Sequence, residues 1–145
     1  MAISLSRRTT LLLLFASGAG ACSGLVAGPQ NNSVIPVPAP RDSAYVRARR
    51  ALQAESFTLD RVDSARGVLT GARWPTASAR QGTSAACHVT LALKIDGNSN
   101  SSAVASTSRW VAPGSMSDKA PTVCDQERTA VLERTAQVLA PAATP

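Results

Sequence analysis

The sequence is poor in the residues that most often carry out chemistry. Aromatic residues make up 3% of the 145 positions, and there is a single histidine. The motifs G-x-S-x-G, H-E-x-x-H and the phosphate-binding loop are absent. Serine and aspartate are plentiful, but no spacing selects a pair to act with His88. We therefore expect no enzymatic activity and no cofactor, and a modest core built mostly of Val, Leu and Ala.

The sequence also lacks an apolar run long enough to cross a bilayer, which takes about 20 residues. Its clearest apolar segment contains the leucines at 11–14, follows Arg7 and Arg8, and gives way to Ala19-Gly20-Ala21-Cys22. A basic segment, a short apolar segment and small residues before a cleavage point are typical of an export signal. Residues 1–21 are predicted to be a signal peptide of the bacterial lipoprotein type.

Cys22 is the predicted lipidation site, because a thiol placed just after small residues can receive a diacylglyceryl group before the chain is cut in front of it. An ordinary cleavable signal is the alternative, since Ala19 stands where lipoprotein signals usually carry Leu. Ser6-Arg7-Arg8 also permits twin-arginine export, although Thr10 replaces the usual bulky apolar residue. With lipidation, the protein is held on a bacterial membrane and faces the periplasm or the exterior.

The chain has three cysteines, and lipidation of Cys22 leaves Cys87 and Cys124 as a pair. In an oxidising compartment such a pair normally forms a disulfide. It would close a loop of about 36 residues, worth roughly 3.5 to 4 kcal/mol in the chain-entropy model. Zinc binding by Cys87, His88 and Cys124 is the alternative, but it requires a fourth ligand and a closer spacing. We predict the disulfide and no metal.

The net charge of +6 comes almost wholly from arginine, because lysine occurs only at positions 94 and 119. An exported protein rarely meets nucleic acid, so we expect no nucleic-acid partner. Arginine-rich surface can still contact lipid phosphates or anionic envelope polymers.

Composition divides the predicted mature chain into three parts. Residues 22–41 are rich in Gly, Ser, Asn and Pro and are predicted to be a flexible tether. Residues 42–139 are predicted to form one small domain, and 140–145 a disordered Ala/Pro tail.

Hydrophobic periodicity predicts the elements of that domain. A helix runs from an N-cap at Asp42 to Glu55, strands at 57–62 and 68–74 form a hairpin, and strands at 87–96 and 103–111 form a second one. The strand at 87–96 is the clearest, since apolar residues at 87, 89, 91, 93 and 95 alternate with small or polar ones. A last helix is capped by Thr122. Its predicted buried face is Cys124, Arg128, Val131, Leu132, Thr135, Val138 and Leu139.

The predicted fold is therefore α+β, with a four-stranded antiparallel sheet of two hairpins and an N-terminal and a C-terminal helix on one face. Signal, tether and small α+β unit together resemble small bacterial envelope lipoproteins. The layout is similar to the repeated domains of the accessory lipoproteins of outer-membrane protein assembly. The resemblance lies in organisation and implies no site residues.

Two functions remain open after this reading. The first is a structural or protein-interaction module of the envelope, with a membrane partner through the lipid anchor and an envelope protein partner. The second is a binding module for a lipid or other anionic envelope ligand. Arg47, Arg50 and Lys94 are the candidate surface residues for either. A closed pocket between sheet and helices would favour the second, whereas a filled core with an apolar or charged outer sheet face would favour the first.

Overall fold

The computed structural model describes residues 24–74 and 87–141. In chain order these residues form strands β1 (Leu25–Ala27) and β2 (Asn31–Val37), helix α1 (Arg41–Ala54), strands β3 (Thr58–Asp63), β4 (Val68–Arg73), β5 (His88–Gly97) and β6 (Ser102–Pro113), the short 3₁₀ helix η3 (Gly114–Met116) and helix α2 (Ala120–Leu139).

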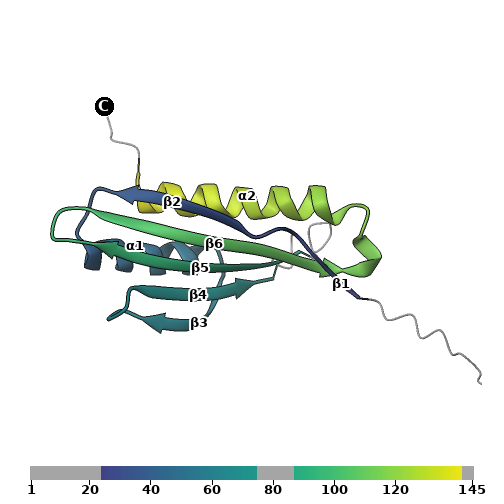
Figure 1. The fold of residues 1–145 in the computed structure, drawn as a ribbon, viewed down its shortest axis with the longest axis horizontal. Coiled ribbons are helices and arrows are strands. Elements are labelled where there is room, and N and C mark those ends of the chain that lie inside the picture. Colours follow the sequence, from purple (N-terminus) through teal and green to yellow (C-terminus); the bar gives the residue numbers. More distant parts are fainter. Residues whose placement is uncertain (1–23, 75–86, 142–145) are drawn as a thin grey trace, which may run out of the picture.

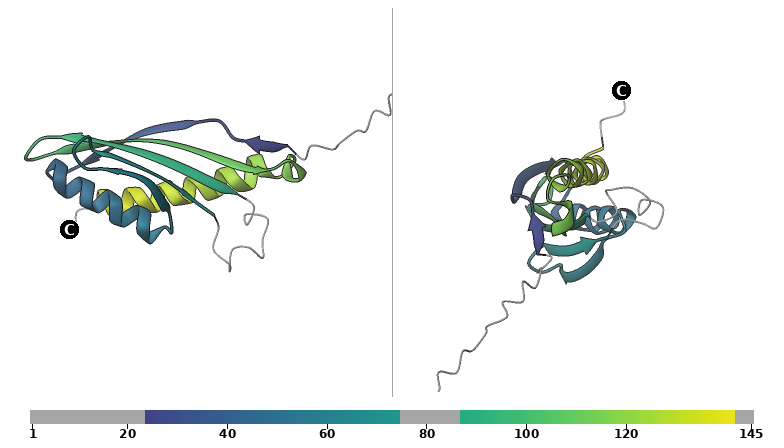
Figure 2. Two further views of the ribbon diagram at one scale, coloured as in Figure 1. Left: turned by 90° about the horizontal axis from the view of Figure 1, so that it is seen from below. Right: turned by 90° about the vertical axis from the view of Figure 1, so that its right-hand side faces the viewer.

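The strands form one antiparallel sheet in the order β1-β6-β5-β4-β3, and β2 also pairs with β6. Both helices lie on one face of this sheet (Figures 1 and 2). We call this covered face the inner face and the opposite one the open face. The α+β class and the antiparallel sheet were predicted correctly. The four-strand prediction was wrong, because the sheet of the described residues has six strands.

The two additional strands lie in the segment 22–41 that was predicted to be a flexible tether. β2 pairs with β6 over seven positions, from Asn31 opposite Ser108 to Val37 opposite Ser102. Val34, Ile35 and Val37 give this segment β-branched side chains, and Pro36 is tolerated because β2 bonds to the sheet on one side only. The folded unit therefore begins at β1 rather than at residue 42.

The short connection between β1 and β2 packs against the sheet and the last helix. Gly28 lies against the ring of Trp110, where an added Cβ would be 2.1 Å from Nε1. The buried Arg128 of α2 donates through Nη1 to the carbonyl oxygen of Pro29 (2.9 Å). The glycine and the arginine thus hold the N-terminal strands in place.

Helix α1 buries the face that its periodicity predicted, namely Ala44, Tyr45, Ala48, Ala51 and Leu52. The prediction of Asp42 as its N-cap was wrong, because the helix begins at Arg41 and no side chain caps it. The backbone N–H of Arg41 instead donates to the carbonyl oxygen of Asn98 in the β5–β6 turn (3.1 Å). A contact distant in the sequence thus satisfies the backbone donor of the first helical residue.

Strands β3 and β4 form the predicted hairpin, with Gly67 of the turn at a φ of 66° that favours glycine. β5 and β6 form the second hairpin over ten paired positions. The inner face of β5 is the predicted one, and its side chains are at most 2% exposed. They are Val89, Leu91, Leu93 and Ile95, preceded by the buried Cys87.

Helix α2 begins two residues before the predicted cap Thr122, with Pro121 in its first turn and no side-chain cap. Cys124, Arg128, Val131, Thr135 and Leu139 of its predicted face are buried. Leu132 is partly buried against the core, whereas Val138 is 45% exposed and was assigned wrongly. The helix lies across the inner face near β6 and beside α1 (Figure 2).

Candidate functional site

The open face is the main unpartnered surface of the sheet within the described residues. In β5 it carries His88, Thr90, Ala92 and Lys94, which alternate with the core residues. The register places each of these four in a cross-strand row. The rows are Ala27, Val111 and His88; Arg109, Thr90 and Ala72; Asn32, Thr107, Ala92 and Thr70; and Val34, Ala105, Lys94 and Val68. Most of these side chains are small or polar, as is typical of a sheet face that is open to solvent.

Lys94, a predicted surface residue, lies in the last of these four rows, and one further row, that of Asp96, Ala103 and Pro36, lies between it and the β5–β6 turn. Its Nζ donates to the carbonyl oxygen of Arg66 (2.6 Å) and pairs with the carboxylate of Asp96 (2.8 Å). In the same row Val34 is 67% exposed. This row therefore combines an exposed apolar side chain with a charged one whose position is fixed by two contacts.

Arg47 and Arg50, the other two predicted surface residues, lie on α1. They line a shallow hollow of about 400 Å³ together with Asp42, Ser43 and Val46. Because α1 covers the inner face and Lys94 belongs to the open face, the sheet separates the arginines from the lysine. The structure therefore brings Arg47 and Arg50 together but does not place Lys94 with them.

An aromatic pair that the sequence reading did not single out lies at the other end of the open face. The rings of Trp74 and His88 are stacked, with centroids 4.1 Å apart and planes inclined by 23°. Trp74 is 60% exposed, so the outer side of its indole faces solvent. Burial lowers the pKa of His88 below its ordinary value of 6.5, so the imidazole is neutral at pH 7. One signal was available: Trp74 is one of only two tryptophans.

A hollow of about 250 Å³, lined by both polar and apolar groups, occupies the middle of the open face. Its charged lining residues are Asp60 and Arg109, and its hydroxyls come from Thr70, Thr90 and Thr107. The hydroxyl of Thr70 donates to Asp60, and Nε of Arg109 donates to the carbonyl oxygen of Gly28 (3.3 Å). The hollow borders the Trp74–His88 row, since Thr90 follows His88 by two residues on the same face.

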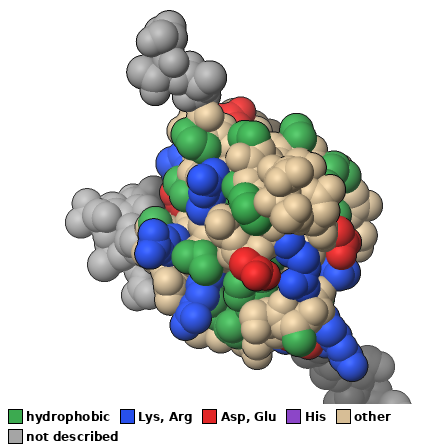
Figure 3. All heavy atoms as spheres, turned by 90° about the vertical axis from the view of Figure 1, so that its left-hand side faces the viewer, with side chains coloured by type: hydrophobic (Ala, Val, Ile, Leu, Met, Phe, Trp, Pro, Cys, Tyr) green, Lys and Arg blue, Asp and Glu red, His purple; other side chains and the backbone are tan. Residues whose placement is uncertain are grey.

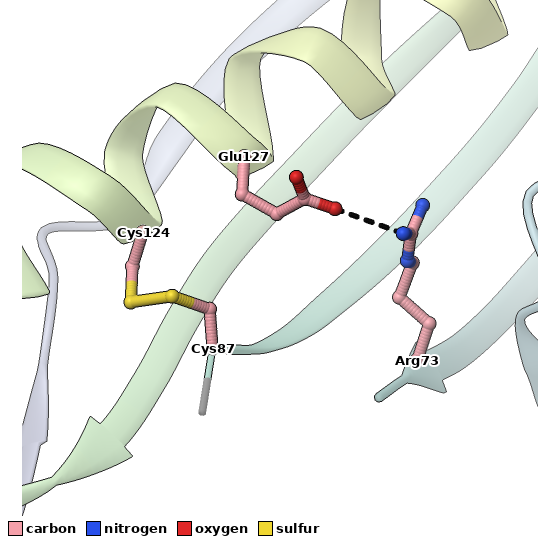
Figure 4. The surroundings of a disulfide bond; sticks show 4 residues. All are labelled: Arg73, Cys87, Cys124 and Glu127. Carbon is pink, nitrogen blue, oxygen red and sulfur yellow. Dashed lines mark hydrogen bonds and ion pairs between the residues drawn. A yellow bond between two sulfur atoms is a disulfide. The ribbon is translucent and has the colours of Figure 1, made fainter. Parts of the chain in front are cut away.

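The inner face is held to the helices by the predicted disulfide. Cys87, just before β5, is bonded to Cys124 in the first turns of α2, and both are fully buried (Figure 4). One turn further along α2, Glu127 accepts from Nη2 of Arg73 on β4 (2.8 Å). No group of three metal-binding side chains occurs within residues 24–74 and 87–141.

Arg73 belongs to an ion network that joins three elements. Its Nη1 donates to Glu55 at the end of α1 (2.9 Å), and Glu55 also accepts two bonds from Arg134 of α2 (2.8 and 2.9 Å). The bonds from Arg134 are the main reason that the pKa of Glu55 is lowered, with burial opposing them. The same bonds raise the pKa of Arg134. The network is structural, because its members point toward one another.

The remaining hollows of the described chain are also shallow. One of about 370 Å³ lies on the outer side of α2, and one of about 500 Å³ lies between the start of α1 and the β3–β4 turn. None of these four hollows is a chamber between sheet and helices. The space there is filled by a continuous cluster of buried side chains.

Cys22, the predicted lipidation site, lies outside the described residues, as do the predicted signal peptide and most of the predicted tail. Among helices of the described chain, none has the length and apolar character needed to cross a bilayer.

Comparison with solved structures finds the same fold in the crystal structure of Ara h 8.0201. The two share 8% sequence identity and a TM-score of 0.54 over 80% of this chain and 95% of that chain. A norcoclaurine synthase of Thalictrum flavum (8% identity, TM-score 0.48, 80% and 96% covered) and a DUF4468 family protein of Bacteroides ovatus (13%, 0.43, 80% and 89%) are more distant. No family model and no curated protein sequence matches the chain. At these identities the similarity to Ara h 8.0201 extends to the fold alone.

Proposed function

We propose that the protein is a lipid-anchored module of the bacterial envelope that acts as a structural or protein-interaction element. The signal-like N-terminus with Cys22 supports the anchor, and a disulfide between Cys87 and Cys124 suits an oxidising compartment. The observation that carries the interaction role is the contrast between a filled core and a broad open face. The expectation of an envelope location follows from these features together.

The protein partner is expected at the Lys94 row. An exposed apolar residue, Val34, lies two strands from a fixed cation, Lys94, with the small Ala105 between them. Small and apolar side chains permit close approach, and the fixed charge selects the orientation of the partner. Figure 3 views the end of the molecule where the β3–β4 and β5–β6 turns lie, and Lys and Arg side chains are spread over it. An acidic partner surface suits this end.

Site-specific photo-crosslinking in living cells tests the interaction role. A photoreactive side chain at Ala105, in the middle of the Lys94 row, should give a discrete protein adduct that mass spectrometry identifies. The same group at the exposed Thr129 of α2 is the matched control. Lys94→Met should weaken the Ala105 adduct, whereas Arg49→Met on α1 should not. Equal labelling from Ala105 and Thr129, or no adduct from Ala105, would reject the proposal.

Cell fractionation tests the anchor separately. Cys22→Ser should release the protein from the membrane fraction or leave its signal uncut, with a matching change in mass. Unchanged fractionation and mass would show that Cys22 carries no lipid.

Binding of an anionic ligand is the second candidate, and the hollow lined by Arg47 and Arg50 favours it. Asp42 in the same hollow offsets part of the positive charge, which is why we rank it second. Saturable binding to phosphatidylglycerol vesicles, weakened by salt and lost in Arg47→Gln/Arg50→Gln but kept in Arg49→Gln, would replace the interaction role with this one.

A further inference from the structure

The Trp74 end of the open face has the features of a ligand site rather than of a plain solvent surface. Trp74 is supported from beneath by His88, so its indole is held in place while its outer face stays exposed. An exposed tryptophan fixed in this way presents a flat apolar surface whose π system is slightly negative. The C–H groups on one side of a pyranose ring are apolar and slightly positive, and they complement such a surface.

The neighbouring hollow supplies the polar half of the site. Successive residues on one side of a strand are roughly 7 Å apart, so the row of Thr90 and Arg109 lies directly beside the Trp74–His88 row. Arg109 donates to Gly28 through Nε, and within residues 24–74 and 87–141 its other N–H groups have no acceptor. Asp60 accepts one bond, from Thr70, and a carboxylate can accept several. Arg109 thus offers donors and Asp60 offers acceptor sites to a ligand in the hollow.

The charge of the site selects the class of ligand. The lining residues include one carboxylate, Asp60, and one guanidinium, Arg109, and the adjoining His88 is neutral at pH 7. A phosphate or polyanion would find no surplus of positive charge here. The hydroxyls of the hollow already donate within the protein, Thr90 to the carbonyl oxygen of Arg109 (3.3 Å) and Thr107 to Asn32 (2.9 Å). A purely apolar ligand would, however, cover the carboxylate of Asp60 and the guanidinium of Arg109 without giving them bonds. A neutral ligand with many hydroxyls and one apolar face fits both observations.

We propose that this half of the open face binds a neutral glycan chain, with one sugar ring stacked on Trp74 and the next one hydrogen-bonded by Thr90, Asp60 and Arg109 in the hollow. The inference goes beyond the proposed function, since it assigns a second ligand to the end of the face opposite Lys94. Neither a protein partner nor the lipid anchor is needed for it, so the two proposals fail independently.

Calorimetric and tryptophan-fluorescence titrations of the full chain, extracted in a detergent without a sugar headgroup, test the site. Tetra-N-acetylchitotetraose and maltotetraose are the neutral probes, and inorganic polyphosphate is the anionic one. We expect saturable binding of at least one sugar in roughly the millimolar range or tighter. Trp74→Ala should weaken it at least about fivefold, a loss in line with one aromatic stacking contact. Trp74→Phe should keep most of the affinity.

The matched control is Val138→Ala, which removes another exposed apolar side chain, on α2 and away from the open face. It should leave sugar affinity unchanged. Thr90→Val adds a check on the polar half and should weaken binding without altering the melting temperature. Failure of both sugars to bind, equal binding by Trp74→Ala, or displacement of the sugar by polyphosphate would overturn the proposal.

Discussion

The two faces of one sheet differ completely in what they carry. Along β5 the inner side chains, such as Leu91 and Leu93, are at most 2% exposed, while the alternating open-face residues Thr90 and Ala92 are small and half-buried. The helices pack against the inner face, and the disulfide and the ion network bond them to its strands. Stability therefore depends on one face, and the other is free to carry recognition.

Within the inner face, a second difference separates the β5 side from the β6 side. Around β5 the packing is apolar, whereas beneath β6 the side chains of Ser106, Ser108 and Thr135 are buried beside Arg128. The hydroxyl of Ser106 bonds that of Ser33 on β2 (2.7 Å). The N-terminal strand thus docks partly through polar contacts, which contribute less stability than apolar burial.

The largest expected effect comes from a cavity on the inner face. Leu93→Ala should lower the free energy of unfolding by about 3 kcal/mol, since a fully buried leucine leaves a void that a packed core fills only in part. Thr90→Ala on the open face should change it by less than about 0.5 kcal/mol. Chemical denaturation of both variants checks the contrast, and similar losses from the two would show that the open face is covered in solution.

The disulfide gives the next largest effect. The unreduced protein should show no reactive thiol at Cys87 or Cys124, and the double variant Cys87→Ala/Cys124→Ala should be less stable by about 3 kcal/mol. For a domain of this size that corresponds to roughly 10 °C in melting temperature. Thiol labelling and thermal melts measure the two quantities. Labelling of both cysteines in native protein would contradict the structure.

Removal of the carboxylate from the ion network should have a moderate effect that depends on pH. Glu55→Gln should lower the free energy of unfolding by about 1.5 kcal/mol at pH 7, because it weakens charge-assisted bonds to Arg73 and Arg134. The pKa of Glu55 is lowered by folding, so its contribution is present above the ordinary pKa of 4.5 and is lost as the pH falls through the lowered value.

Melting curves between pH 7 and pH 3 test this sign. The difference between wild type and Glu55→Gln should shrink as the solution becomes more acidic than roughly pH 4. A difference that grows on acidification would refute the assignment.

The smallest expected effect is that of Lys94→Glu. The change removes the bond to the carbonyl oxygen of Arg66 and sets a carboxylate beside Asp96. We therefore expect the free energy of unfolding to fall by about 0.5 to 1 kcal/mol. Arg49→Glu, at an exposed position of α1, serves as the control. Its free energy of unfolding should stay within about 0.5 kcal/mol of the wild-type value. Equal stability of the two variants would mean that the contacts of Lys94 contribute nothing measurable.

Periodic segments were predictable from the sequence, because burial on one side imposes a pattern on neighbouring residues. The alternation in β5 and the apolar face of α1 are examples. The pairing of Cys87 with Cys124 was predictable for another reason, because these two cysteines remain once Cys22 is assigned to lipid. β2 was missed because Asn31, Asn32 and Pro36 are typical of a spacer, and its pairing partner lies some seventy residues away. The β-branched residues around Pro36 were the signal that could have identified an edge strand.

The candidate site was only partly predictable for a related reason. Arg47 and Arg50 are close in sequence and lie together, but Lys94 belongs to another layer. Trp74 and His88 come together through the pairing of β4 with β5, which no local pattern specifies. The partners of Glu55, on β4 and α2, likewise depend on tertiary packing.

If Cys22 is lipidated as proposed, the pairing of β1 with β6 also sets the height of each surface above the membrane. Leu25 is three positions after Cys22, and an extended chain covers about 3.5 Å per residue, so a lipid on Cys22 would keep β1 within roughly 10 Å of its anchor point. Ala27 shares its row with His88. With that anchor, the Trp74 end would stay near the headgroups, within reach of sugars carried by the membrane itself. The β5–β6 turn, roughly 30 Å along the strands, is the end that can extend outward to other proteins.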